Sequence, residues 1–265
     1  MSLSKTHIVF YVLSAFMQAG FLCFSQPIEN NPGQDNNPYE TGIKFSDSQH
    51  EIVFQSLSPD FEYNAVRCIY KDHKGFMWFG TESGLVRYDG INLYMYENIT
   101  GSSTSLNSST INVITEDKNK NLWIGTPAGL NLYHREEDNF SGVPDAGDTI
   151  NALNQMLITA LYADENSLVW TGTYNNGLYA YDYKNKRITV YTHNNNDSLS
   201  ISSDQITCIT KDKNGHLWVG TQNGLNLLTS EAVFQHFFNE PDNIYSLSNN
   251  HITCLTLDND CLLYT

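Results

Sequence analysis

The sequence is poor in charged residues, and those it has are unbalanced. Only 16% of its 265 residues are Asp, Glu, Lys or Arg, and 14 basic side chains face 29 acidic ones. A net charge of −15 repels nucleic-acid phosphates and anionic lipid surfaces, so we expect no nucleic-acid partner. The same charge makes a sulfated or uronic-acid-rich ligand less natural, unless a local basic patch overrides it.

Motifs of common catalytic, metal and cofactor sites are also missing. No serine stands in a Gly-x-Ser-x-Gly elbow, and no glycine-rich phosphate cradle follows a strand. The stretch Asp212-Lys213-Asn214-Gly215 resembles the start of a calcium loop, but the distant bidentate Glu is absent and a hairpin is favoured. We therefore predict no catalytic, metal-binding or cofactor-binding residue. The histidines of residues 51–265 form no pair at i, i+2 or i, i+4: His73, His134, His193, His216, His236 and His251.

What the chain does have is a repeat. Its four tryptophans each begin a Trp-x-Gly-Thr tetrapeptide and lie 45, 47 and 48 residues apart, the spacing of four-stranded β-propeller blades. A β-branched residue stands twelve positions before each Trp, an Asp six before it, and a Gly-Leu pair six or seven after it. This pattern predicts an all-β array of blades, with the tryptophans at positions 78, 123, 170 and 218.

Each repeat reads as four short strands. In the fourth repeat, turns are predicted at 212–215 and 221–224, because Asp and Asn bond their own backbone and Gly accepts positive φ. The strands around these turns are rich in β-branched and aromatic residues. We expect them at Ile206–Thr210, Leu217–Gly220, Leu225–Leu228 and Val233–Phe238.

The N-terminus looks like a leader. Residues 1–25 contain one Lys before an apolar stretch and end in Cys23-Phe24-Ser25, with small side chains at the two positions that a signal peptidase reads. This pattern predicts a cleaved signal peptide and periplasmic localisation. An uncleaved signal anchor is the alternative. Residues 26–50 are rich in Asn, Gln and Pro near their start and are expected to be a flexible spacer. The propeller then spans 51–265, with repeats at 64–108, 109–155, 156–203 and 204–249 and an incomplete one at 250–265.

Both ends of the repeat region are uneven. Residues 52–57 precede the first repeat at the position of the fourth strand of a blade. Tyr264 stands where a fifth repeat would place its Trp. About four and a half blades are therefore expected, and an open array should expose strand edges and be poorly soluble. We interpret the chain as the front of a longer, truncated protein.

Two stretches carry a specific resemblance. Asp72–Gly90 and Asp117–Tyr133 both resemble the two-component regulator propeller repeat, and the likeness extends over residues 52–265. The resemblance implies a propeller of about seven blades in the periplasmic half of a hybrid two-component sensor histidine kinase. It further implies oligosaccharide ligands released from complex glycans, and a possible homodimer of the full-length receptor. No kinase module is present in this chain, so we expect no enzyme activity, and contact with the membrane only through the leader or a C-terminal part.

Residues that recur in every repeat are expected to be structural. The tryptophans should pack between blades. Cys68, Cys208 and Cys254 share one repeat position. Because Val113 and Ala160 occupy that position in the other repeats, we expect it to require a small apolar side chain. Ligand contacts should come from what differs between repeats. The candidates are the insertion at 173–176 and the link at 145–154, without a site being assigned.

The sequence therefore favours an extracytoplasmic propeller that senses glycan-derived oligosaccharides and signals to a histidine kinase. Two alternatives stay open. One is a secreted propeller enzyme such as a polysaccharide lyase, with catalytic His, Tyr or Arg at one mouth of the channel. The other is a scaffold that binds a protein through its blade tops.

Overall fold

The computed structural model describes residues 65–143, 153–230 and 232–257, with isolated two-residue strands outside these ranges. The chain divides into two compact units, residues 1–65 and 66–265. In the first, β1 (Cys23–Phe24) pairs with β4 (Val53–Phe54), and β2 (Ser46–Asp47) pairs with β3 (His50–Glu51). Apart from these strands, the predicted leader, spacer and strand 52–57 lie outside the described residues. No helix within the described ranges is long and apolar enough to span a membrane.

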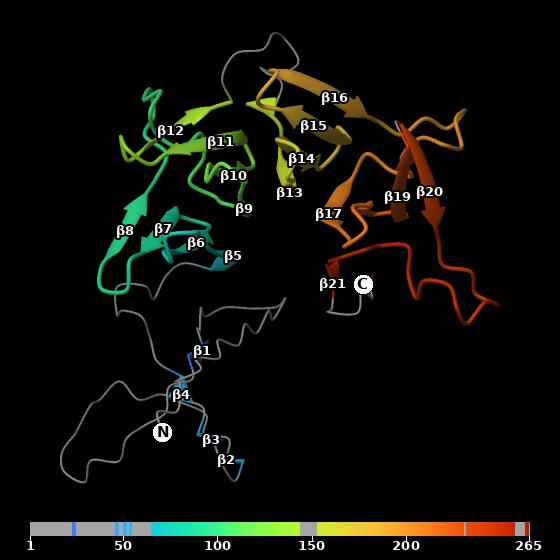
Figure 1. Ribbon diagram of the computed structural model, residues 1–265, viewed down its shortest axis with the longest axis horizontal. Coiled ribbons are helices and arrows are strands. Elements are labelled where there is room, and N and C mark those ends of the chain that lie inside the picture. The colour runs from blue at the N-terminus through green and yellow to red at the C-terminus, as the bar shows by residue number, and fades with distance from the viewer. Residues whose placement is uncertain are drawn as a thin grey trace. The chain divides into compact units, whose positions relative to one another are not determined.

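The second unit consists of antiparallel four-stranded sheets in which neighbours in sequence are neighbours in space. Four such sheets follow one another along an arc, with the first strand of each on the inner side and the fourth on the outer side (Figure 1). This is the all-β propeller-blade architecture that the repeat predicts. The strands are β5 (Val66–Lys71), β6 (Met77–Thr81), β7 (Leu85–Tyr88) and β8 (Leu93–Tyr96); β9 (Val113–Glu116), β10 (Leu122–Thr126), β11 (Gly129–His134) and β12 (Asn139–Gly142); β13 (Ile158–Ala163), β14 (Leu168–Thr173), β15 (Leu178–Asp182) and β16 (Arg187–Tyr191); and β17 (Ile206–Lys211), β18 (Leu217–Thr221), β19 (Gly224–Ser230) and β20 (Val233–Phe237).

The turn between the first two strands of a blade is built by its aspartate. Asp212 Oδ1 accepts hydrogen bonds from the backbone nitrogens of Asn214 and His216, both at 2.9 Å. Gly215 closes the turn with φ +85°, a conformation that glycine adopts without strain. Lys120 and Ser167 take the same place in the second and third blades with φ of 70° and 69°. The predicted hairpin is confirmed.

The glycine of each Trp-x-Gly-Thr allows neighbouring blades to approach. A Cβ on Gly80 would lie 2.4 Å from Cys68 Sγ in the same blade and 2.7 Å from Ile111 Cγ2 of the next blade. Val113 and Ile158 crowd the glycine at 125 in the same way. The small apolar residue predicted at the cysteine position therefore fills a gap beside this glycine. Burial raises the pKa of the Cys68 thiol to about 12, so this cysteine is a packing residue.

The first three tryptophans pack against the next blade, as predicted, while Trp218 is half-buried and contacts Phe237 of its own blade. Trp78 and Trp123 are fully buried or nearly so, and Trp170 is 6% exposed. Trp78 shares a core cluster with Leu122 and Tyr133 of the second blade, and its ring centroid lies 5.0 Å from that of Tyr133. Three clusters of this kind hold the four blades together.

The fifth repeat begins in the expected register. Strand β21 (Thr256–Leu257) pairs with β22 (Leu263–Tyr264), and Thr256 stands opposite Tyr264 as Thr210 stands opposite Trp218. Tyr264 thus occupies the backbone position of the repeat tryptophan. The backbone nitrogen of Ile252 donates to Thr221 O at 3.0 Å, which ties this repeat to the fourth blade.

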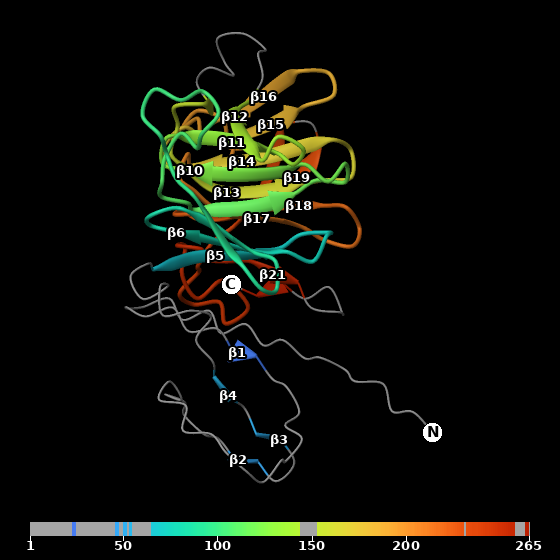
Figure 2. The same cartoon turned by 90° about the vertical axis from the view of Figure 1, so that its left-hand side faces the viewer.

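The antiparallel meander gives the blades two distinct faces. Turns from the first to the second strand and from the third to the fourth lie at one end of every blade, here called the turn face. Turns from the second to the third strand and the links between blades lie at the other end, here called the link face. Figure 2 shows strands such as β6, β10 and β17 crossing the view, with connections at both ends.

Candidate ligand-recognition site

A hydrogen bond between Asp and Trp recurs at the turn face. Trp78 Nε1 donates to Asp72 Oδ2 at 3.0 Å, and Trp123 and Trp218 donate in the same way to the aspartates six positions earlier, at 3.0 and 3.1 Å. Burial by itself would raise the pKa of Asp72, but hydrogen bonds from Trp78 and Arg135 lower it. Because this hydrogen bond recurs in three blades, it stabilises the repeat and does not mark a ligand site.

The third blade departs from this pattern. Trp170 Nε1 is buried and has no hydrogen-bond partner. Asp164, six positions earlier, instead directs Oδ2 to Lys211 Nζ of the fourth blade at 3.3 Å. The Asp164 side chain is 2% exposed, so its negative charge is compensated by a lysine from the neighbouring blade.

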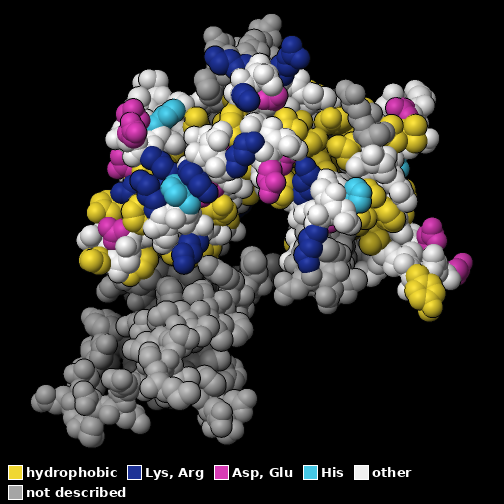
Figure 3. Space-filling view, in the orientation of Figure 1, with side chains coloured by type: hydrophobic (Ala, Val, Ile, Leu, Met, Phe, Trp, Pro, Cys, Tyr) yellow, Lys and Arg dark blue, Asp and Glu magenta, His cyan; other side chains and the backbone are white. Residues whose placement is uncertain are grey.

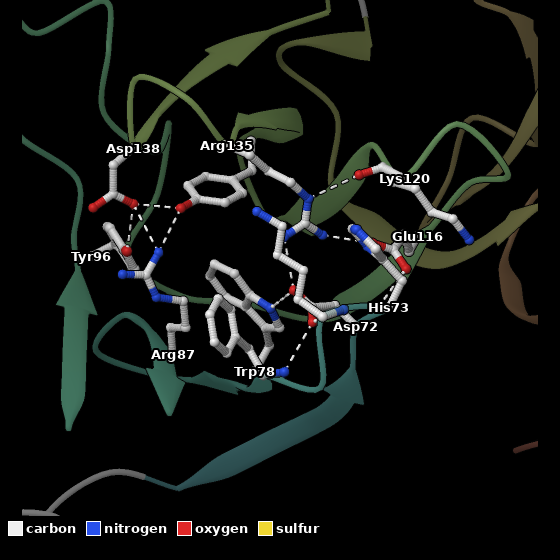
Figure 4. Close-up of polar contacts among 12 residues, drawn as sticks. Asp72, His73, Trp78, Arg87, Tyr96, Glu116, Lys120, Arg135 and Asp138 are labelled. Carbon is white, nitrogen blue, oxygen red and sulfur yellow. Dashed lines mark hydrogen bonds and ion pairs between the residues drawn. The ribbon is translucent and has the colours of Figure 1, made fainter. Parts of the chain in front are cut away.

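Between the first and second blades, Arg135 also binds the aspartate that accepts the Trp78 hydrogen bond. Arg135 lies between β11 and β12 (Figure 4). Its NH1 donates to Asp72 Oδ2 at 2.8 Å and its NH2 to Glu116 Oε1 at 2.6 Å, while Nε donates to Lys120 O at 3.0 Å. The two acceptor side chains are 0% and 7% exposed. Two buried carboxylates from adjacent blades thus share one guanidinium, which satisfies all of its donor-bearing nitrogens.

His73 completes this part of the network. Its Nδ1 lies 2.6 Å from Glu116 Oε1, and its backbone nitrogen donates to Glu116 Oε2 at 3.0 Å. The imidazole is 28% exposed, in the turn between β5 and β6. Glu116 therefore joins the turn of the first blade to the first strand of the second.

Beside this network Arg87 lies among aromatic rings. Its guanidinium carbon is 4.6 Å from the ring centroid of Tyr94 and 5.5–5.8 Å from those of Phe76, Trp78 and Tyr96. Its side chain is 15% exposed. Cations are attracted to aromatic faces at this range, so the rings hold the guanidinium in place.

Polar groups of the second blade meet the same guanidinium. Arg87 NH1 donates to Tyr133 OH at 2.8 Å and to Asp138 Oδ1 at 3.1 Å, and Tyr96 OH donates to the same carboxylate oxygen at 2.7 Å (Figure 4). Tyr133 OH also donates to it. Burial alone would raise the pKa of Asp138, but these phenols and Arg87 lower it, so the group is a carboxylate at neutral pH.

Arg87 breaks the repeat. Aligned on the Gly-Leu pair, its position is filled by Leu132, Ala180 and Leu227 in the other blades. A charged group thus stands where the fold places an apolar one, and Arg87 Nε is buried without a hydrogen-bond partner. Local departures from fold rules concentrate at functional sites, and a charge in an apolar repeat position is the sequence signal that could have revealed this residue.

Groups suited to ligand recognition remain available at this place. Asp138 is 50% exposed on its side chain and uses only Oδ1 in the contacts above, and Tyr94 is 40% exposed. Among the described residues, no hydrogen bond to NH2 of Arg87 is found. A donor, an acceptor and an exposed aromatic ring are together what a polar, ring-shaped ligand requires. We call Arg87, Tyr94, Tyr96, Tyr133 and Asp138 the Arg87 cluster.

The two places that the sequence favoured for ligand contacts lie elsewhere. Tyr174 in the insertion is 44% exposed on the link face, and Asn175 Oδ1 accepts a hydrogen bond from Gln205 of the next link at 3.0 Å. The link 145–154 lies outside the described residues except for its last two positions. There Asn154 Oδ1 accepts from the Val143 backbone nitrogen at 2.9 Å.

A cavity of about 210 Å³ opens on the link face between the third and fourth blades. His193 and His236 line it, but their ring nitrogens lie 2.8 and 2.7 Å from the carbonyl oxygens of Ile201 and Ser200, respectively. These imidazoles therefore hold the link that precedes the fourth blade. Other lining residues are Asn194, Asn195, Asp197, Ser198, Ser202, Asn223 and Phe238.

Comparison with known proteins identifies the repeat. The family profile described as two component regulator propeller matches residues 60–83, 105–128 and 200–223, which contain the first two strands of the first, second and fourth blades. Histidine kinase P4 of Formosa agariphila is 33% identical over 188 residues, which is 67% of this chain and 13% of that protein. The chain thus spans a small part of this curated relative.

Solved structures agree on the fold. The extracellular domain of a B. thetaiotaomicron protein described as a hybrid two component system superposes with a TM-score of 0.66 at 21% identity, over 98% of this chain and 38% of that one. Virginiamycin B lyase of Staphylococcus aureus superposes with a TM-score of 0.54 at 13% identity, over 85% of this chain and 76% of the lyase. At these identities the likeness concerns the fold alone. With its profile matches and its repeat geometry, the chain belongs to the two-component regulator propeller family.

Proposed function

We propose that this chain is the extracytoplasmic ligand-sensing propeller of a two-component receptor. It would reach the periplasm through its leader, bind an oligosaccharide derived from a glycan, and pass the binding event to a histidine kinase. A histidine kinase is proposed as the partner because the curated relative is named a histidine kinase. Ligand binding would act by favouring one arrangement of adjacent blades over another.

The observation that carries the proposal is the Arg87 cluster. It lies across the boundary between the first and second blades, because Arg87 and Tyr94 come from one and Tyr133 and Asp138 from the other. A ligand that contacts both would change the free energy of that blade interface. Differential contact with two arrangements is what a sensor needs in order to convert binding into a signal.

Binding can be tested on the full chain with a panel of gluco-, xylo- and galacto-oligosaccharides and oligogalacturonates. We expect at least one compound to raise Tm and to give a calorimetric binding isotherm, because a ligand of the folded state stabilises it. Arg87→Leu installs the residue of the second and fourth blades and should abolish binding while leaving the unliganded fold intact. Tyr174→Ala, at the insertion on the link face, serves as the matched control and should bind normally.

Other outcomes would favour other functions. Release of unsaturated sugar products would support a lyase, the alternative that the sequence leaves open. Loss of binding in Tyr174→Ala but not in Arg87→Leu would move the ligand to the insertion. If no oligosaccharide binds and a defined protein partner does, the chain is a scaffold.

A further inference from the structure

Positive charge is segregated by face. Among the described residues, every Lys and Arg except Arg67 lies in a turn of the turn face or at a strand end beside one. Figure 3 shows Lys and Arg side chains gathered over the first two blades on the face that it displays. The exposed cations of the turn face are Lys71, Lys74, Lys118, Lys120, Lys184, Lys186, Arg187 and Lys213.

Several acidic residues of the turn face are buried. Asp72, Asp117 and Asp164 are buried, and each already accepts hydrogen bonds within its hairpin turn. The exposed acidic residues of this face among the described ones are Glu136, Glu137, Asp138 and Glu165, while Asp89, Asp182 and Asp212 are partly exposed. Eight exposed cations therefore stand against four exposed anions.

The link face has the opposite balance. Its described charges comprise one cation, Arg67, which pairs with Glu82 at 3.1 Å, and a set of acidic residues. Those that are exposed are Glu82, Glu97, Asp197, Glu240 and Asp242. The described blades thus present a cationic and an anionic face, although the whole chain is strongly acidic.

The two faces lie far enough apart for salt to screen the charges of one face from a ligand at the other. Strands of four to seven residues at about 3.3 Å per residue place the two faces roughly 13–23 Å apart. The Debye length at physiological ionic strength is about 8 Å, so exposed charges beyond it are largely screened. A ligand at the turn face therefore responds to the lysines near it and not to the net charge of the chain.

We infer that the ligand of the turn face is an anionic oligosaccharide, bearing carboxylate or sulfate groups, that binds across the first and second blades. The inference rests on the proposed sensing function and adds the chemical class of the ligand. Lys74 and Lys120 belong to the two turns that Arg135 links through Asp72 and its own bond to Lys120 O. With Arg87 nearby, they supply cations on both blades, and guanidinium and ammonium groups bind such anions by charge-assisted hydrogen bonds. The exposed lysines Lys74 and Lys120 are the local basic groups that this inference requires.

Binding by the full chain should be measured by calorimetry with matched pairs of oligomers. Galacturonic-acid oligomers are compared with neutral galactose oligomers, and a sulfated galactose oligomer forms a third arm that separates sulfate from carboxylate. We expect the anionic oligomers to bind at least tenfold more tightly than the neutral ones, and the difference to shrink as salt is raised.

Two double variants with equal loss of charge locate the site. Lys74→Gln with Lys120→Gln should weaken anionic binding about tenfold, a factor equivalent to 1.4 kcal/mol. Lys184→Gln with Lys186→Gln, on the outer turn of the third blade, should change it less than twofold. Thermal unfolding of both variants without ligand verifies that they fold.

The possible failures are distinguishable. Neutral oligomers that bind as tightly as anionic ones would overturn this inference and leave the sensing function standing. Equal losses in both double variants would show an unlocalised attraction and contradict a site between the first two blades. Absence of binding by every oligomer in these and the wider panel would overturn the sensing function itself.

Discussion

The indole nitrogens of the repeat are not equivalent, although the sequence places an aspartate six residues before each of them. Trp123 Nε1 donates to Asp117 at 3.0 Å, whereas Trp170 Nε1 is buried without a partner because Asp164 is drawn to Lys211. A hydrogen bond to a charged acceptor contributes about 1.5–3 kcal/mol. The third blade therefore lacks one stabilising contact of the repeat.

This difference predicts unequal costs for the same substitution. Trp123→Phe removes ring area and a charge-assisted hydrogen bond, while Trp170→Phe removes ring area only. We expect Trp123→Phe to lower the free energy of unfolding by about 1.5–3 kcal/mol more than Trp170→Phe does. Urea unfolding of the two variants measures the difference, and equal losses would show that the Asp–Trp bond adds nothing to stability.

At the scale of elements, the strand that carries Trp-x-Gly-Thr serves two blades at once. Its glycine lies between a small residue of its own blade and a β-branched residue that begins the first strand of the next blade. A Cβ on Gly125 would lie 2.7 Å from Val113 Cγ1 and 2.6 Å from Ile158 Cγ2. Real side chains do not approach so closely, so the blades would have to move apart.

Gly125→Ala should therefore be destabilising by about 1–3 kcal/mol or more, which is the usual cost of overpacking. Gly75→Ala is the control, because Gly75 has φ +88° but nothing within 4 Å of an added Cβ. It should cost only the strain of a left-handed residue, about 1–2 kcal/mol. A shift in Tm no larger for Gly125→Ala than for Gly75→Ala would contradict tight blade contact at this glycine.

At the scale of the whole unit, carboxylates stabilise the blades and two of them also join the first blade to the second. Asp72, Asp138 and Asp212 accept hydrogen bonds that outweigh burial, and the pKa of each is lowered from its ordinary value near 3.8. A carboxyl with a lower pKa in the folded state stabilises the fold above its unfolded pKa, and this stabilisation is lost as pH falls through the folded value.

We therefore expect Tm to fall steeply below about pH 4 and to change little from these groups above about pH 5. Asp138→Asn should flatten part of the acid slope, because the lost carboxylate no longer needs to be protonated. Circular dichroism melts across the acid range measure both effects. A Tm independent of pH below 4 would show that these carboxylates do not stabilise the fold.

Much of this protein follows from local chemistry that a sequence displays. The spacing of the tryptophans, the Asp turns and the Gly-Leu pairs predict four-stranded blades and their strand order, since hairpin turns and alternating apolar residues act over a few positions. The shared position of Cys68 and Val113 predicts a small apolar site, and the close contact at Gly80 and Gly125 confirms it. Even the register of Tyr264 in the fifth repeat follows from counting.

Other features depend on contacts between residues about 45 to 65 positions apart, which no local pattern encodes. Arg135 contacts Asp72, and Arg87 contacts Asp138, only because the blades stand side by side. For the same reason Asp164 pairs with Lys211 and not with Trp170. The segregation of charge likewise requires knowing which turns share a face. The sequence by itself thus determined the repeat and the blade, whereas the tertiary structure decided the partners of the charged side chains, because pairing across blades depends on distances that exist only after the blades have packed.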